Sequence, residues 1–262
     1  MTERIFATVL LATAAAVISH RTGLLTAGGA AAQWVLATLL FGIGGWQWVV
    51  PMLAFFLPAS LISHIPSDRR TRAETISSKG AQRDAVQVLA NGGVGGLILL
   101  MWWAKPETVW YGAYLGAVGA AAADTWGTEI GTMSPESTRL ITTLRRVDRG
   151  VSGGITLSGY FAGAVGSALI FAAGLPWILE EARWQFALAT IGASLAGTTF
   201  DSLLGAAVQA RYRCVRCGGT TERKSHCGSP SLRISGLSWV SNDVVNLACT
   251  GLGGGVGAAF VR

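Results

Sequence analysis

The stretch A-A-A-A-D-T-W-G-T-E-I-G at residues 120–131 places two carboxylates, Asp124 and Glu129, directly after an apolar run of small residues. A carboxylate at membrane depth is costly unless a cation, a partner or water compensates it, so we interpret the pair as functional. Five residues on a continuous helix put two side chains roughly 140° apart. We therefore expect the helix to end or unwind at Gly127 if both acids serve one site. The alternative is that both acids are solvated at the membrane surface.

The composition around this stretch is that of a polytopic membrane protein. Of the 262 residues, 51% are hydrophobic and only 13% are charged, whereas a soluble domain carries roughly 25% charged residues. Apolar segments of the length that a bilayer requires lie at residues 4–19, 25–44, 46–64, 85–104, 109–123, 155–179, 186–209 and 237–260. We predict an all-α fold, a polytopic transmembrane helix bundle of about eight spans.

The acidic residues divide these spans into two regions. Residues 1–64 contain no acid after Glu3, and we interpret them as a three-span scaffold. Residues 65–262 contain almost all other charged groups, and we interpret them as a five-span catalytic core with cytoplasmic loops. Within the core, residues 85–123 and 155–209 resemble one another as hairpins with a glycine-rich entry and an acidic return, which suggests a degenerate parallel repeat.

The positions of the cations predict the orientation. Most of the 20 Lys and Arg residues fall in the polar connections that follow the first, third, fifth and seventh spans. Because cytoplasmic loops carry an excess of these residues, we expect these connections inside, both termini outside and the site at the cytoplasmic face of a cell membrane. The net charge of +6 is then a topology signal, and we do not expect nucleic-acid binding.

A polar stripe leads into the fourth span. Lys79, Arg83, Gln87 and Asn91 recur at every fourth residue, so on a helix they would share one face that descends into an apolar segment. The glycines that follow allow a ligand or another helix to approach the backbone closely. We predict that these four residues bind phosphate; the alternative is a packing face whose polar groups bond across helices.

The loop V-D-R-G-V-S-G-G-I-T-L-S-G at residues 147–159 precedes the sixth span. Glycines and hydroxyls before a helix N-terminus offer free backbone N–H groups and a positive dipole end to an anion. We therefore add Gly150, Ser152 and Gly153 to the predicted phosphate site. The alternative is a flexible loop joined to a close-packed helix.

The last two spans contribute further polar groups. Asp201 lies in G-T-T-F-D-S-L-L-G, where its position along the span predicts a depth similar to that of Asp124. Asn242 and Asn246 are one helical turn apart at the start of the last span, with Asp243 beside Asn242. Acid and amide groups at the end of an apolar helix predict a role in the same site.

The third polar connection contains a candidate metal site. Residues 211–233 include Cys214-x-x-Cys217 followed by His226 and Cys227. Disulfides are rare in the cytoplasm, whereas thiolates and imidazole are the usual ligands of structural Zn²⁺. We predict a possible zinc knuckle; the alternative is a set of free thiols.

Together these groups predict phosphoryl or nucleotidyl transfer. Carboxylates suit Mg²⁺, which binds one or two carboxylates plus substrate phosphates, while cations and helix N-termini suit the phosphates. We predict that Mg²⁺ is bound by the four carboxylates of these segments, which are Asp124, Glu129, Asp201 and Asp243.

Six motifs in fixed order resemble a known family. They are K-G-x-x-R-D-x-x-Q-V-x-A-N-G from Lys79, D-T-W-G-T-E-I-G from Asp124, R-G-V-S-G-G-I-T from Arg149, G-T-x-F-D-S-x-L-G-A from Gly197, C-x-x-C with a later His-Cys, and N-D-x-V-N from Asn242. Over nearly the whole chain, the sequence resembles the uncharacterised membrane-protein family that includes the chloroplast phytyl-phosphate kinase. The resemblance implies a kinase that uses CTP or another nucleoside triphosphate to convert a prenyl monophosphate to the diphosphate, with distant kinship to dolichol and phytol kinases.

Two alternatives remain. A lipid-phosphate cytidylyltransferase would use similar groups, but it would release pyrophosphate and form a CDP-lipid. An ion-coupled transporter or lipid scramblase would use the acids for coupling ions. That last class predicts a water path to the outer face, yet the outer halves of the spans contain almost no polar residues.

Overall fold

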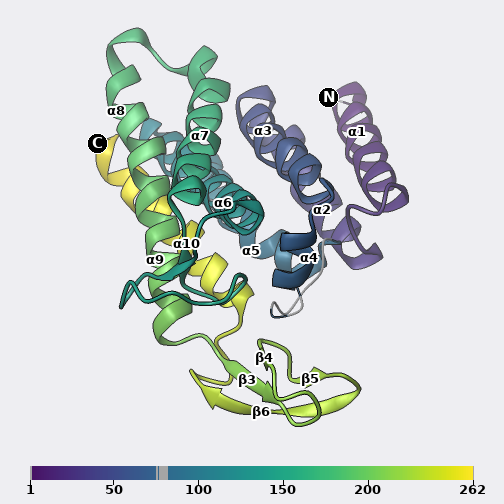
Figure 1. Ribbon diagram of the computed structural model, residues 1–262. Helices are drawn as coiled ribbons and strands as arrows, with labels where there is room; N and C mark the ends of the chain where they lie inside the picture. Colours follow the sequence, from purple (N-terminus) through teal and green to yellow (C-terminus); the bar gives the residue numbers. More distant parts are fainter. Residues whose placement is uncertain (1, 75, 77–81, 262) are drawn as a thin grey trace.

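The computed structural model describes residues 2–74, 76 and 82–261 and is mostly helical (Figure 1). In chain order the helices are α1 (Thr2–Arg21), α2 (Ala27–Leu39) with the π-helical turn η1 (Leu40–Gly44), α3 (Trp46–Ser63), α4 (Asp68–Glu74), α5 (Ala85–Ala104), α6 (Thr108–Met133), α7 (Leu157–Gly174), the 3₁₀ turns η2 (Leu175–Trp177) and η3 (Glu180–Ala182), α8 (Arg183–Ala187), η4 (Leu188–Gly192), α9 (Ala193–Ala207) and α10 (Asn242–Phe260). The predicted apolar segments coincide with these helices.

Among the described residues, five helical stretches are long and apolar enough to cross a membrane. They are Ala27–Gly44, Trp46–Ser63, Ala85–Ala104, Leu157–Trp177 and Glu180–Ala207. The other segments predicted to span are helical too: the apolar part of α1 is shorter, and α6 and α10 are rich in Gly and Ala, which lowers their hydropathy. The chain is therefore a helical integral membrane protein with five clear candidate spans.

The prediction of an all-α fold is wrong in one region. A small four-stranded antiparallel sheet with the order β4-β3-β6-β5 lies beyond one end of the bundle (Figure 1). Its strands are β3 (Arg211–Cys214), β4 (Thr220–Thr221), β5 (Ser225–His226) and β6 (Ser229–Ser235). Gly218 and Gly228 have φ of 71° and 72°, a backbone conformation that suits glycine in tight turns between strands. A two-residue pair, β1 (Arg139–Leu140) with β2 (Gly154–Ile155), lies in the preceding loop region.

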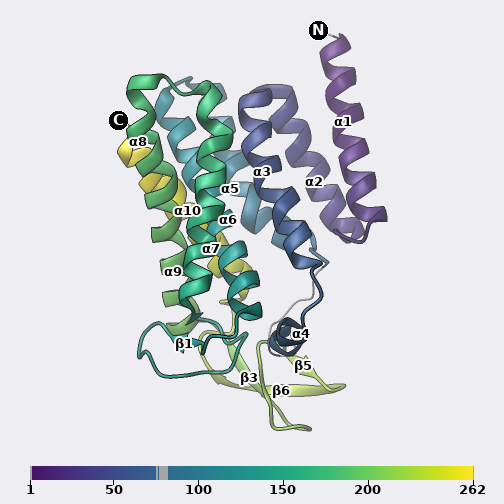
Figure 2. The same cartoon turned by 45° about the horizontal axis from the view of Figure 1, so that its top comes forward.

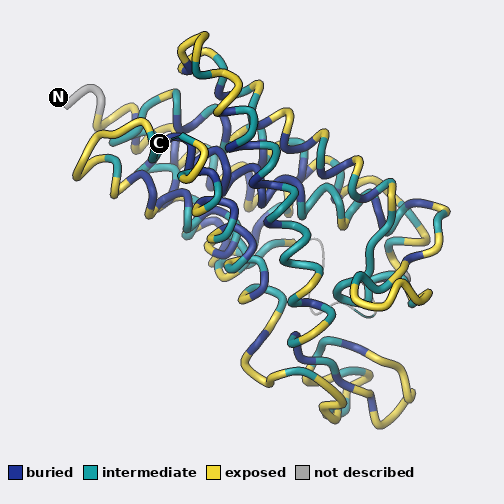
Figure 3. The backbone as a smooth tube through the Cα atoms, turned by 90° about the vertical axis from the view of Figure 1, so that its left-hand side faces the viewer, coloured by how far each residue is buried: buried dark blue, intermediate teal, exposed yellow. Residues whose placement is uncertain are grey.

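Helix α6 is the centre of the bundle. It packs against α3, α5, α7, α9 and α10, and its residues from Tyr111 to Ala123 are all buried. The small side chains of α6 permit this contact: an added Cβ at Gly116 would overlap the backbone of Gly253 in α10. Figure 3 shows the buried backbone concentrated within the helices, while the sheet is largely exposed or intermediate. Glycine therefore sets the distance between the central helices.

Helix α6 also continues without a break through Gly127, so the expected unwinding at this residue is wrong. Gly127 has another role, because an added Cβ there would lie 3.2 Å from the carbonyl oxygen of Gly159 in α7. One turn later, an added Cβ at Gly131 would lie 2.9 Å from Thr156 Oγ1. The glycines let α7 approach α6, and Asp124 and Glu129 remain on different sides of an intact helix.

The two ends of the bundle differ in composition. At the end away from the sheet, Trp48 packs its ring against Trp102, Tyr111 and Tyr114, and Tyr111 also contacts Phe186. Figures 1 and 2 place both chain termini toward this end, opposite the sheet. The termini thus share one side, as the predicted orientation requires, and which side faces the cytoplasm stays a prediction.

Candidate functional site

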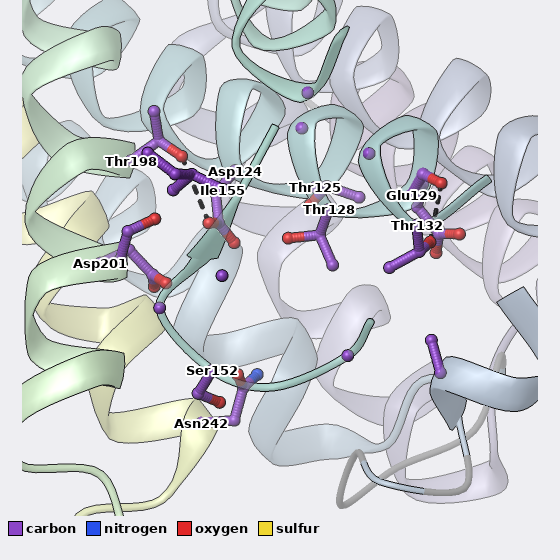
Figure 4. A pocket seen from close by; sticks show the side chains of 18 of the residues that line it. Asp124, Thr125, Thr128, Glu129, Thr132, Ser152, Ile155, Thr198, Asp201 and Asn242 are labelled. Carbon is purple, nitrogen blue, oxygen red and sulfur yellow. Dashed lines mark hydrogen bonds between the residues drawn. The ribbon is translucent and has the colours of Figure 1, made fainter. Parts of the chain in front are cut away.

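A cavity of about 280 Å³ lies at the sheet end of the bundle, and most of the predicted site residues line it (Figure 4). They come from the segments that precede or form α5, α6, α9 and α10, and from the loop before α7. The predicted residues that line the cavity are Arg83, Gln87, Asn91, Asp124, Glu129, Gly150, Ser152, Gly153, Asp201, Asn242 and Asn246. Segments that are far apart in the sequence thus supply one concave site.

One described residue that was predicted for this site, Asp243, is not part of the cavity wall. Lys79 lies outside the described residues. Asp243 is half-buried on α10 but is not among the residues that line the cavity, because about 100° of helical rotation separates it from Asn242. Asn242 and Asn246, one turn apart, both face the cavity.

Two acids and two polar side chains form what we call the acidic side: Asp124, Thr198, Asp201 and Asn246. Thr198 Oγ1 donates to Asp124 Oδ1 at 3.4 Å, and the Asn246 amide, with its nitrogen turned toward Asp201, donates to Asp201 Oδ2 at 3.2 Å. Within the described residues, Asp201 interacts electrostatically with two neighbouring acids, Asp124 and Glu222. This half of the cavity therefore carries negative charge that a cation would compensate.

The opposite half, which we call the basic side, consists of Ser63, Arg70, Arg83 and Glu129. Arg70 Nη1 lies 3.5 Å from Glu129 Oε2, and the Ser63 hydroxyl donates to Glu129 Oε1 at 2.7 Å. Figure 4 shows Glu129 across the cavity from Asp124 and Asp201. Glu129 is thus engaged with a cation, in contrast to the two aspartates.

Arg83 is the cation of the basic side that reaches furthest into the bundle. Its guanidinium contacts the hydroxyls of Ser60 and Ser63 at 3.4 and 3.5 Å, and it lies 5.9 Å from the ring centre of Phe56. Burial lowers the pKa of Arg83, and the charge of nearby Glu129 opposes this shift. Because hydroxyls compensate a buried charge only in part, Arg83 is suited to a further anionic partner.

The four carboxylates that the sequence assigned to Mg²⁺ do not form one cluster. Within the described part of the chain, the group of three or more Cys, His, Asp or Glu side chains that could share a metal ion is the cysteine–histidine set. The reason is the continuity of α6, which directs Asp124 and Glu129 to different halves of the cavity. Asp124 and Asp201 remain as the facing pair.

The polar stripe before α5 has a different structure from the predicted helix. Helix α5 begins at Ala85, with Asp84 as its N-cap and Gln87 completing a capping box. Arg83 precedes the helix in extended backbone, where its N–H donates to the Leu24 carbonyl at 3.0 Å. Of the three stripe residues that the structure describes, Gln87 and Asn91 share a helical face, and the cavity still gathers Arg83 with them.

The loop before α7 is held in place rather than flexible. Gly150 and Gly153 have φ of 84° and 79°, and a Cβ at Gly153 would lie 2.5 Å from Ala206 Cβ, so both positions require glycine. Arg211 Nη2 donates to the carbonyl of Ser152 at 3.3 Å and to that of Ala206 at 2.9 Å. These contacts fix the loop against the end of α9.

The N-terminus of α7 is already occupied by an acid of the chain. Glu136 Oε2 accepts from the N–H groups of Leu157 and Ser158 at 3.0 and 3.4 Å, and Thr156 caps Gly159 N–H at 3.0 Å. The expectation that this helix end offers free N–H groups to a phosphate is therefore wrong. Among the N-termini expected at the site, that of α10 has no side-chain cap from its N-cap residue, Ser241.

The structure adds residues that the sequence analysis did not select. Arg70 lies among the cations of the connection after the third span, and Ser63 ends an otherwise apolar span. Glu222 directly follows strand β4 and accepts a hydrogen bond from Ser152. Of the added residues, only Thr198 had a usable signal, since it lies three positions before Asp201 on the same helix.

The cysteine–histidine set forms a second site, outside the cavity. The ligand atoms of Cys214, Cys217, His226 and Cys227 all lie within 4.8 Å of one another. A hydrogen bond from the backbone at Cys217, assisted by the His226 side chain, lowers the pKa of Cys214 to about 6, whereas burial raises the pKa of Cys227. Three thiols and one imidazole at this spacing fit a tetrahedral structural Zn²⁺.

Comparison with known proteins identifies the family of this chain. The sequence pattern of the family described as integral membrane protein DUF92 matches residues 10–254. The chain belongs to this family. The matched range includes every residue of the cavity and of the cysteine–histidine set, so the DUF92 assignment covers both sites.

Individual DUF92 relatives are distant but similar in length. The chain is 26% identical to Protein PGR of Arabidopsis thaliana, over 93% of this chain and 91% of that protein. It is 29% identical to an uncharacterized membrane protein of Methanocaldococcus jannaschii, over 78% and 82% of the two chains. It is 26% identical to an uncharacterized membrane protein of Synechocystis, over 89% and 81%. No solved structure matches the chain.

Proposed function

We propose that this protein is a Mg²⁺-dependent membrane kinase that transfers a phosphoryl group from CTP or another nucleoside triphosphate to a prenyl monophosphate. The product would be the prenyl diphosphate, of phytyl or geranylgeranyl type. The observation that carries the proposal is the division of one cavity into an acidic side and a basic side. A metal–nucleotide complex and an anionic acceptor need these two environments next to each other.

The acidic side fits Mg²⁺ by its chemistry. Asp124 and Asp201 provide two carboxylates, and the neighbouring charges that act on Asp201 are acids. Mg²⁺ in nucleotide enzymes is bound by one or two protein carboxylates and otherwise by phosphate and water. When bound, the ion would neutralise charge on the phosphates of the nucleotide.

The basic side and the start of α10 would position the phosphates. Arg83 and Asn91 line the cavity from the α5 side, and Asn242 lines it at the start of α10. In the reaction, an acceptor phosphate oxygen forms a bond to the γ-phosphorus while the bond from that phosphorus to the β–γ bridging oxygen breaks, releasing the nucleoside diphosphate. The acceptor oxygen is already anionic, so the step needs no strong general base.

The composition of the opposite end of the bundle favours an enzyme over a transporter. The aromatic side chains there fill the space between α3 and α6, with Trp48 and Tyr114 fully buried and the Tyr114 hydroxyl bonded to the Trp48 carbonyl. A transport path would need polar groups or water at that depth. A cavity at one end of the bundle, with packed aromatic side chains at the other end, is better suited to chemistry at one face.

The deciding experiment uses the purified chain with Mg²⁺, geranylgeranyl monophosphate and CTP or ATP carrying label on the γ-phosphate. We expect label in geranylgeranyl diphosphate, with loss of transfer in Asp124→Asn. A parallel reaction with α-labelled CTP separates the alternative, because a cytidylyltransferase would place that label in a CDP-lipid. Absence of γ-label transfer to any prenyl or polyprenyl phosphate would overturn the kinase proposal.

A further inference from the structure

A second cavity, of about 90 Å³, lies between α2, α3 and α5 on the scaffold side of the molecule. Most of its wall consists of aliphatic and aromatic side chains, including Leu36, Ala37, Met52 and Phe56, and its polar lining residues are Gln33, Arg83, Gln87 and Asn91. We call it the α2–α3–α5 groove. It is separate from the acidic side of the site and has none of the acids described above.

The groove adjoins the polar cavity. Arg83, Gln87 and Asn91 line both spaces, so the groove begins where the basic side ends. The opposite side opens toward lipid, because Leu53 lines the groove and is still 37% exposed on the outer surface of α3. A molecule in the groove would therefore contact a cation at one end and the bilayer at the other.

Glycine in α5 maintains this geometry. Gly92 lines the groove, and an added Cβ there would lie 3.0 Å from Leu36 Cδ1 on α2. The glycine allows α2 to pack closely beside α5, and the space that remains is narrow. A volume of about 90 Å³ suits part of one hydrocarbon chain better than the paired acyl chains of a glycerophospholipid.

We infer that the α2–α3–α5 groove binds the head-proximal part of a single-chain isoprenoid phosphate, with its phosphate beside Arg83 and its distal chain in the bilayer. This inference deepens the proposed function by assigning the acceptor to the scaffold side and the nucleotide to the acidic side. Charge supports the orientation, since the groove reaches the buried Arg83 guanidinium, whose hydrogen bonds go to two hydroxyls at 3.4 and 3.5 Å and whose charge is influenced by nearby Glu129. It also gives residues 1–64 a binding role beyond that of a scaffold.

Photo-crosslinking without nucleotide tests the location. The full chain in phosphatidylcholine nanodiscs is illuminated with a prenyl monophosphate that carries a diazirine on the isoprene unit nearest the phosphate. We expect adducts on peptides from α2 and α3 that line the groove, competed by geranylgeranyl monophosphate but not by geranylgeraniol. Adducts spread over the exposed faces of α7 and α9, or equal competition by the alcohol, would overturn the assignment.

Variants of the groove test the chain specificity. Ala37→Phe places a ring in the groove, while Val35→Phe makes the same type of change on the exposed face of α2, where Val35 is 49% exposed. We expect Ala37→Phe to weaken geranylgeranyl monophosphate binding by roughly tenfold through lost apolar burial. Affinity for dimethylallyl monophosphate should fall by less than that for the long chain, because its single isoprene unit buries less apolar surface. Equal affinities for the long chain in both variants would contradict the inference.

A second variant guards against a folding defect. Met52→Ala shortens a side chain of α3 and so widens the groove. The variant should still bind the long-chain lipid, and a larger share of the crosslinks should fall on residues of α3. The kinase proposal fails separately: groove-specific binding with no γ-phosphate transfer would remove the kinase and leave the binding site. Transfer that is unaffected by Ala37→Phe would leave the kinase and remove the groove.

Discussion

Asp124 and Glu129 lie on the same helix, five residues apart, and yet have opposite surroundings. Glu129 contacts Arg70 at 3.5 Å and accepts a hydrogen bond from Ser63. Among the described residues, Asp124 accepts a side-chain hydrogen bond from Thr198 alone, at 3.4 Å, and it faces Asp201 across the acidic side. An intact helix thus divides one cavity into two electrostatic environments, because the rotation about the helix axis between residues five positions apart directs the two carboxylates toward different neighbours.

The comparison shows which acid is available to a cation. The charge of Glu129 is already compensated within the chain, while Asp124 and Asp201 add to each other's negative potential. Metal ions are bound where ligands of one sign gather, and ion pairs within the chain compete with that role. If this division is correct, substitutions on the two sides must have separable effects.

The largest effect should come from the acidic side. Asp201→Asn and Asp124→Asn should each lower the phosphoryl transfer rate by roughly 10³-fold, since each removes charge that positions the metal–nucleotide complex. Without Mg²⁺, the same changes should keep or raise the melting temperature, because they relieve repulsion between two facing carboxylates. Thermal scans with and without Mg²⁺ measure these melting temperatures. The increase in melting temperature that Mg²⁺ gives the wild type should disappear in both variants.

Thr198→Val is the matched control for these substitutions. It removes the hydroxyl that donates to Asp124 but leaves both carboxylates. We expect only a several-fold loss of rate and a retained response to Mg²⁺. A response to Mg²⁺ that survives in Asp124→Asn but is lost in Thr198→Val would refute the two-carboxylate site.

The next effect should come from Arg83 on the basic side. Arg83→Gln should raise the KM for the lipid phosphate by about 10- to 100-fold, because a charge-assisted hydrogen bond to phosphate is replaced by a neutral one. The KM for the nucleotide should change much less. Arg69→Gln is the control, since Arg69 is exposed and donates to the Met133 carbonyl outside the cavity. Similar KM values for both variants would place the acceptor elsewhere.

Much of this arrangement could be predicted from the sequence, for a physical reason. Polar residues such as Asn91, Asp201 and Asn246 lie in apolar helices where solvation is unfavourable, so their positions alone indicate that they meet a common polar space. The helices themselves were predictable because bilayer spans are long apolar segments. The same argument fails for Ser63 and Thr198, because serine and threonine hydroxyls can bond to the backbone of their own helix and need no common polar space.

The rest depended on tertiary partners that a linear pattern does not contain. Arg70 belongs to a basic stretch that looks the same whether it faces lipid headgroups or Glu129. Glu136 caps α7 from 21 residues away, so no local motif marks that helix end as occupied. The sheet of residues 211–235 depends on short strands between glycine turns. Strand β4 pairs with β3 and strand β5 pairs with β6 over only two residues each, which is too short to leave a pattern.

Glu129→Gln sharpens the comparison through an expected difference in kind. It should lower the free energy of unfolding by on the order of 1 kcal/mol, because Arg70 and Arg83 lose a partly exposed anionic partner. The apparent affinity for Mg²⁺ should stay within about twofold of wild type, since Glu129 belongs to the other side of the cavity. Chemical denaturation and Mg²⁺ titration measure the two quantities. Loss of Mg²⁺ affinity as large as in Asp124→Asn would restore the single four-carboxylate cluster.

The smallest effect should follow removal of metal from the cysteine–histidine set. Glu222, in the connection between β4 and β5, accepts a hydrogen bond from Ser152 and acts electrostatically on Asp201, so the region of the sheet adds one acid beside the acidic side. We expect the purified chain to contain about one Zn²⁺ per molecule, and Cys217→Ser to abolish it. Transfer should then fall by only about threefold, in line with Glu222→Gln, because the sheet supports the cavity without supplying Asp124 or Asp201. Elemental analysis alongside kinetics tests this order: a loss as large as that of Asp124→Asn would mean that the sheet, rather than α6 and α9, holds the acidic side together.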